Sequence, residues 1–92
     1  MSGVKNNPLT IFVCTHVPFR VPPYIEARPD IYTIITNSRD RFLPTKLRVL
    51  RVDNMQCDYG PEENLCLNEW RMINAIYHMK ALPEYIGICH YN

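Results

Sequence analysis

Residues 61–89 read PEENLCLNEWRMINAIYHMKALPEYIGIC and place a helical segment directly before a short apolar one. Pro61 suits the first turn of a helix, and the acidic pair Glu62–Glu63 suits the positive end of the helix dipole. Pro83 ends the helical segment. We therefore predict one long helix over Glu62–Ala81 and a buried strand over Tyr85–Cys89. A helix that feeds a buried strand is half of a parallel α/β unit.

Three earlier segments are typical of strands. Leu9–Cys14 is a continuous apolar run, which predicts a strand buried on both faces, and Ile31–Thr36 is rich in β-formers. Lys46–Val52 alternates basic and apolar residues, which predicts a strand with one solvent-facing side near a sheet edge. Four prolines after the first segment leave room only for a single helical turn at Tyr24–Arg28. We therefore predict an α/β fold with a mainly parallel sheet, as one domain over residues 1–92.

The composition limits the class of protein. Hydrophobic residues make up 47% of the chain, too many for a disordered tail, and 92 residues suffice for one modest core. Ten basic side chains against nine acidic ones leave a net charge of +1, which argues against a dedicated nucleic-acid binder. No apolar run approaches the length of a membrane span and no secretory signal begins the chain, so we expect a soluble cytoplasmic protein.

The predicted helix is amphipathic with one exception. Its apolar side comprises Leu65, Cys66, Trp70, Met72, Ile73, Ile76, Tyr77 and Met79, and its polar side comprises Asn68, Arg71, Asn74 and His78. We expect Trp70 and Tyr77 in the core. Glu69 falls near the middle of the apolar side, where an unpaired carboxylate is costly. Either a partner such as Lys80 or a backbone amide neutralises Glu69, or the helix faces a polar site.

The four cysteines are Cys14, Cys57, Cys66 and Cys89, with no Cys-x-x-Cys pair among them. The even count is compatible with two disulfides, but the lack of a secretory signal favours reduced thiols. A structural zinc site built from Cys14, His16, Cys89 and His90 is a further alternative. Cys14 and His16 point the same way from a strand, whereas the adjacent Cys89 and His90 point oppositely.

Polar residues follow each of the four predicted strands. They are Thr15–His16, Asn37–Ser38, Asp53–Asn54 and His90–Tyr91–Asn92. If the strands are parallel, these residues converge on one edge of the sheet, which we call the rim. Ligands of open parallel sheets bind beyond the carboxyl ends of the strands, so the rim is the expected binding site.

Three stretches carry a family resemblance. Residues 11–19 read IFVCTHVPF, residues 64–70 read NLCLNEW, and residues 85–91 read YIGICHY. Together they resemble the bacterial capsular-polysaccharide and lipopolysaccharide glycosyltransferases first catalogued as a domain of unknown function. In that family they would be the first strand and its turn, the start of a central helix with a glutamate at the Glu69 position, and a strand that ends Cys-His-Tyr before an arginine.

The resemblance implies a GT-A-like fold, in which the first half of a Rossmann-type sheet binds the nucleotide of an activated sugar. The implied activity is transfer of that sugar to a carbohydrate hydroxyl with loss of a nucleoside diphosphate. In such folds an Asp-x-Asp motif holds a divalent ion, Mn²⁺ or Mg²⁺, on the diphosphate. Here Cys89–His90–Tyr91–Asn92 stands at that position, and the family continues with an acceptor half. We therefore expect these residues to form the donor-binding half of an incomplete domain.

The expected nucleotide contacts lie at the ends of the first three strands. They are Thr15, His16, Asn37 and Asp53, with Asp53 holding a ribose hydroxyl. The alternative is that the Thr-His and Asp-Asn pairs are ordinary turn residues. Two arginines that follow the second strand are candidates for the diphosphate, or simply solvated side chains: Arg39 and Arg41.

The expected reaction centre lies at the end of the last strand. His90 and Asn92 are assigned to the diphosphate or the metal, and Glu69 and His90 are the candidate catalytic residues, with Glu69 behind the site. The alternative for His90 is a buried histidine hydrogen-bonded to a carbonyl group.

A second function class is compatible with the same residues. A non-catalytic interaction module would pair through the unpaired sheet edge formed by Lys46–Val52. Its expected partners are a second copy of the chain or a missing C-terminal half. For the enzyme, the expected partners are a nucleotide sugar and a carbohydrate acceptor.

Overall fold

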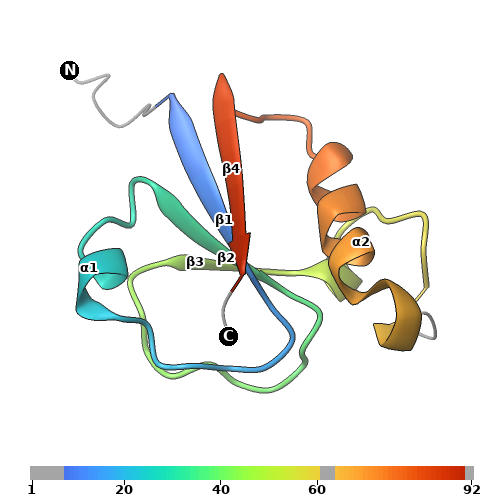
Figure 1. Ribbon diagram of the computed structural model, residues 1–92, viewed down its shortest axis with the longest axis horizontal. Helices are drawn as coiled ribbons and strands as arrows, with labels where there is room; N and C mark the ends of the chain where they lie inside the picture. The colour runs from blue at the N-terminus through green and yellow to red at the C-terminus, as the bar shows by residue number, and fades with distance from the viewer. Residues whose placement is uncertain (1–7, 61–63, 91–92) are drawn as a thin grey trace.

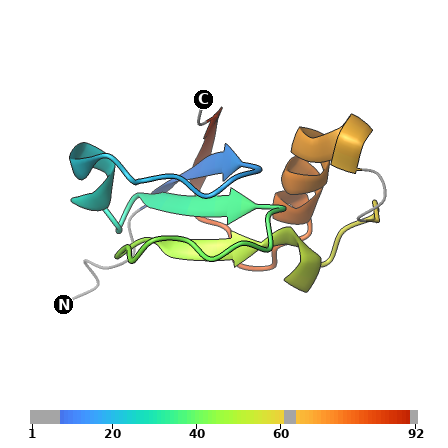
Figure 2. The ribbon, with the colours of Figure 1, turned by 90° about the horizontal axis from the view of Figure 1, so that it is seen from below.

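The computed structural model describes residues 8–60 and 64–90, with the backbone alone for residues 64–68. Four strands form one sheet in the order β3-β2-β1-β4, and every pair of neighbours is parallel. They are β1 (Leu9–Thr15), β2 (Tyr32–Thr36), β3 (Arg48–Arg51) and β4 (Tyr85–His90). Figure 2 shows β1, β2 and β3 stacked in that order with their arrowheads pointing the same way. The predicted α/β class with a parallel sheet is therefore confirmed.

The chain adds strands to both sides of β1, which is the first strand in the sequence. β2 and β3 are added on one side of β1, and β4 is placed on its other side. Three helical segments connect the strands: α1 (Pro23–Glu26), the 3₁₀ turn η2 (Val52–Asn54) and α2 (Asn64–Tyr77). In Figure 1, α1 and α2 lie on opposite sides of the sheet.

The helix α2 is shorter than predicted. It ends at Tyr77, where the Met79 amide donates to the Ile76 carbonyl at 3.0 Å and tightens the last turn. Residues 62 and 63, the start of the predicted helix, lie outside the described residues, as do the side chains of Leu65 and Cys66.

Two hydrophobic clusters cover the two faces of the sheet. On the α2 side, Phe12 and Cys14 of β1 pack with three residues of the helix, Met72, Ala75 and Ile76. On the other side, Val13 of β1 and Ile34 of β2 pack with the residues Phe19, Ile25, Phe42 and Leu47. Successive residues of β1 thus point to opposite faces, as the period of a strand requires. The expectation that this strand is buried on both faces is confirmed over residues 12–15.

The predicted orientation of the helix is confirmed for Met72 and Ile76, which are buried, and is wrong for three other residues. Trp70 and Tyr77, predicted in the core, retain 62% and 77% of their exposure, whereas Arg71, predicted on the polar side, retains only 2%. The sheet covers a narrow stripe of α2 that includes Arg71, Met72, Ala75 and Ile76. The apolar arc of the sequence is wider than this stripe, and its far side therefore faces solvent.

The prediction of a buried last strand is also wrong. Within the described residues β4 pairs with β1 alone, so it forms an edge of the sheet. Three of its side chains are substantially exposed: Tyr85 at 62%, Ile86 at 43% and Ile88 at 43%. The opposite edge is β3, which agrees with the edge position predicted for Lys46–Val52.

Candidate functional site

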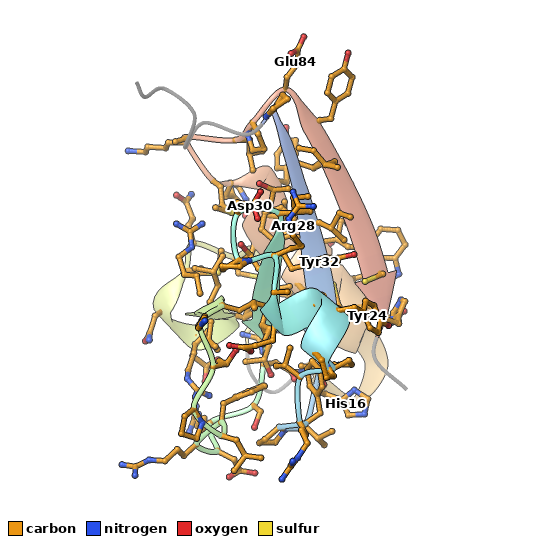
Figure 3. The ribbon with its side chains drawn as sticks, turned by 90° about the vertical axis from the view of Figure 1, so that its left-hand side faces the viewer. His16, Tyr24, Arg28, Asp30, Tyr32 and Glu84 are labelled. Atoms are coloured by element: carbon orange, nitrogen blue, oxygen red, sulfur yellow. The ribbon has the colours of Figure 1, made fainter. Side chains whose placement is uncertain are left out.

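The carboxyl ends of all four strands lie along one edge because the strands are parallel. Register pairs Thr15 with Thr36 and Thr36 with Arg51, while His90 pairs with Cys14. The rim is therefore continuous from β3 to β4. Figure 3 labels His16 beyond this end of the sheet and Glu84 beyond the other. The strand order reverses between β1 and β4, which places the topological switch point beside His90.

Two threonines close the turns after β1 and β2. The Thr15 hydroxyl accepts a hydrogen bond from the Val17 amide at 3.2 Å and donates to the Val17 carbonyl at 2.6 Å. The Thr36 hydroxyl accepts from the Ser38 amide at 3.0 Å. Both threonines are buried, so they fix the direction of the chain at the rim. His16, the residue after Thr15, is exposed there, and Asn37 is half-buried.

The side chains of Glu69, on α2, and His90, on β4, contact each other. The Nε2 atom of His90 lies 2.6 Å from the Oε2 atom of Glu69, and the two side chains are 48% and 54% exposed. His90 lies at the last position of β4, and Glu69 lies in the first half of α2. The partner of Glu69 is thus His90 rather than Lys80 or a backbone amide. The sequence indicates both residues separately, and the fold brings them together.

Among the described residues, the cysteines near this pair do not gather with other ligands as a metal site. Cys14 is buried in the cluster beneath α2, and burial, then the nearby Cys89 and Glu69 charges, raise the pKa of its thiol to about 11. Burial also raises the pKa of Cys89, which packs against the cluster on the other face. The two thiols thus lie on opposite faces of the sheet, which does not favour the zinc alternative. Cys14, Cys57 and Cys89 are free cysteines.

A second polar cluster lies at the other end of the rim, around Asp53 of η2. One Asp53 oxygen accepts from Nε of Arg39 at 2.7 Å, and the other accepts from Nη2 of Arg71 at 3.2 Å. These bonds, Arg39 first, hold the pKa of the Asp53 carboxyl below its usual value. The Nε atom of Arg71 also donates to the Tyr59 carbonyl at 3.2 Å. Asp53 therefore already has a cation on each oxygen, which competes with its expected ribose contact.

Two hollows flank this cluster. One, of about 360 Å³, is lined by Ser38, Arg39, Arg51, Asp53 and Asn54. The other, of about 300 Å³, is lined by Arg39, Val52, Asp53, Met55, Cys57, Tyr59, Gly60 and Arg71. Sequence reasoning missed Arg51 and Arg71 as site residues. The sequence signal for such residues was Asp53 itself, because a carboxylate directly after a strand needs positively charged partners nearby.

The two clusters lie far apart along the rim. Two strands separate β3 from β4, so three strand spacings, about 14 Å, lie between them. In the described ranges 8–60 and 64–90, no three histidine, cysteine, aspartate or glutamate side chains gather as metal ligands. Asn92, one of the two predicted metal ligands, lies outside these ranges. Arg41, the second predicted diphosphate arginine, is exposed on the loop after β2.

Comparisons with known proteins add no family assignment. No family model, curated protein or solved structure matches the chain. Across the described part of the chain, no helix has the length and apolar character needed to cross a bilayer.

Proposed function

We propose that this chain is the donor-binding portion of a nucleotide-sugar-dependent glycosyltransferase that transfers a sugar to a carbohydrate hydroxyl. The observation that supports it most is the exposed Glu69–His90 pair at the switch point of a four-stranded parallel sheet. Ligands of open parallel sheets bind at this point. A GT-A-like fold, which contains a Rossmann-type sheet, would bind the donor there. The proposal assigns the chain to the cytoplasm, where thiols stay reduced.

The proposed roles follow the order of residues along the rim. His16 contacts the base or ribose, with Asn37 beside it, while the buried Thr15 holds the turn that presents His16. His90 meets the diphosphate. When protonated it stabilises the negative charge that develops as the bond between the anomeric carbon and the phosphate oxygen breaks.

Glu69 positions the imidazole of His90 through their 2.6 Å contact. When the Nε2 atom carries a hydrogen and donates it to Glu69, the orientation of the ring is fixed and Nδ1 is left to face the ligand. Alternatively, a neutral His90 would hold a divalent ion together with Asn92, and the ion would neutralise charge on the leaving diphosphate. An imidazole nitrogen in the ligand set suits Mn²⁺ better than Mg²⁺.

Calorimetric titration with uridine and guanosine diphosphate sugars, with and without Mn²⁺, tests the proposal. We expect micromolar binding that Mn²⁺ strengthens. His90→Ala should weaken donor binding about fivefold or more, because it removes a hydrogen bond to a charged group. His78→Ala is the matched control, since His78 also pairs with a carboxylate, Asp58 at 3.1 Å, but from the C-terminal end of α2. Equal affinity of the two folded variants would remove His90 from the site.

One observation favours the second candidate function, an interaction module. The β4 edge carries the exposed side chains Tyr85, Ile86 and Ile88, with no charged residue between Glu84 and His90. The edge predicted for pairing, β3, carries Arg48 and Arg51, and charges of this kind resist strand pairing. A dimeric mass in solution that Ile88→Lys abolishes, together with no binding of any donor, would support the module over the enzyme.

A further inference from the structure

Two arginines bind a single carboxylate at the β3 end of the rim, and a third arginine lines the hollow beside it. Arg39 and Arg71 each bind one oxygen of Asp53, and Arg51 lines the larger hollow beside them. Asp40 and Arg41, the two residues that follow Arg39 in the loop after β2, offset each other in charge. Two arginines, Arg39 and Arg51, line the hollow against the one carboxylate of Asp53, so the hollow has an excess of positive charge.

One of the two arginines that line this hollow is held in place before any ligand arrives. Arg71 does not line it, but it is 2% exposed and holds Asp53 from the buried side. Arg51 donates from Nη1 to the Ser38 carbonyl at 2.7 Å, and its guanidinium lies 5.6 Å from the centre of the Phe42 ring. An arginine that is already ordered loses little conformational entropy when it binds an anion.

The wall of the hollow also supplies neutral donors. Ser38 and Asn54 line it together with Arg39 and Arg51. The Ser38 hydroxyl oxygen accepts a hydrogen bond from the Asp40 amide at 3.0 Å, so the hydrogen of the hydroxyl is not used in this bond and can be donated to a ligand. Guanidinium, hydroxyl and amide donors around a small hollow are the groups that proteins use to bind phosphate oxygens.

We propose that this hollow binds a phosphate group. Its position, about 14 Å along the rim from His90, makes it separate from the proposed diphosphate contact. Arg39 is the mobile part of the site, because its side chain is 77% exposed and can turn from Asp53 to a ligand. Asp53 acts as an internal competitor for the arginines. The phosphate is either free or carried by a nucleotide, and both share this chemistry.

Titration with inorganic phosphate and, separately, with uridine monophosphate tests the proposal in low salt. Arg39→Ala should weaken phosphate binding about fivefold or more, since one charge-assisted contact is lost and Asp53 is left less neutralised. Arg28→Ala is the matched control. Arg28 is also an exposed arginine paired with a carboxylate, Asp30 at 2.9 Å, and it precedes β2 rather than following it. We expect this control to bind phosphate as the wild type does.

Asp53→Asn supplies a second, opposite readout. Removing the competing charge should tighten phosphate binding in the variant that circular dichroism shows to be folded. If it does not fold, the Arg39 and Arg28 variants decide the question. Binding of uridine monophosphate but not inorganic phosphate, still lost in Arg39→Ala, would assign the site to a nucleotide-borne phosphate. No phosphate binding by either probe, or equal affinity of the Arg39 and Arg28 variants, would overturn the proposal.

The outcomes separate this site from the proposed donor site. Phosphate binding that depends on Arg39 but not on His90, in a chain that binds no nucleotide sugar, would keep the phosphate site and reject the glycosyltransferase. Donor binding that depends on His90, with no phosphate binding at the arginines, would do the reverse.

Discussion

Arg71 shows how a single distant residue changes the burial of a helix position. Helical periodicity groups it with polar residues, yet its side chain is 2% exposed because Asp53 and the Tyr59 carbonyl hold the guanidinium. A buried charge is stable only when it is paired and hydrogen-bonded. Asp53 lies 18 residues earlier in the chain, so the pattern of the helix carries no information about it.

Arg71 and Arg39 contact the same carboxylate but should contribute unequally to stability. Arg71→Met should lower the free energy of unfolding by about 3 kcal/mol, because it leaves Asp53 and a carbonyl group without a buried partner. Arg39→Met should lower it by less than about 1 kcal/mol, since Arg39 is largely solvated. Urea unfolding at neutral pH measures both. Equal losses would show that burial does not decide the strength of these ion pairs.

The depressed pKa of Asp53 makes part of the stability pH-dependent. Because the folded pKa lies below its ordinary value of 3.8, the contribution is complete above that value and is lost as the pH falls through the folded pKa. Asp53→Asn removes this contribution at every pH. Urea unfolding should therefore show a gap between wild type and variant that is constant at neutral pH and shrinks below pH 3.8. A gap that widens on acidification would contradict the assigned ion pairs.

At the scale of elements, α2 and β4 depart from what their sequences predict. Both are rich in apolar residues, and periodicity alone places those residues in a core. The sheet covers one narrow stripe of α2 and one edge of β4, so the remaining apolar side chains, Trp70, Tyr77, Ile86 and Ile88 among them, face solvent. A single element does not reveal how many neighbours it has, and burial depends on that number.

Alanine substitutions along α2 test which face packs on the sheet. Ile76→Ala should cost about 3 kcal/mol of unfolding free energy, because it opens a cavity among buried side chains. Trp70→Ala and Tyr77→Ala should each cost less than about 1 kcal/mol, since both side chains are exposed. Chemical denaturation of the three variants gives the comparison. A loss at Trp70 as large as that at Ile76 would mean that the helix is rotated toward the predicted orientation.

At the scale of the whole molecule, the sequence predicts the sheet better than the site. The apolar runs at Leu9–Cys14 and Ile31–Thr36 locate two central strands, and the basic alternation of Lys46–Val52 locates an edge. Each of these patterns lies within one short segment, and each segment forms a strand in the folded protein. The contact of Glu69 with His90, and the capture of Asp53 by Arg39 and Arg71, join segments far apart in the sequence. No local spacing encodes them.

The claim that a nucleotide sugar binds along the rim is tested most directly by following backbone amide NMR shifts. The ¹⁵N-labelled chain would be titrated with uridine and guanosine diphosphate sugars in the presence of Mg²⁺. We predict shifts that gather at the carboxyl ends of the strands, at His16, Ser38 and His90, while Arg28 and Glu84 toward the other end stay unchanged. Shifts centred on Arg28 and Glu84, or none with either donor at saturating concentration, would contradict it.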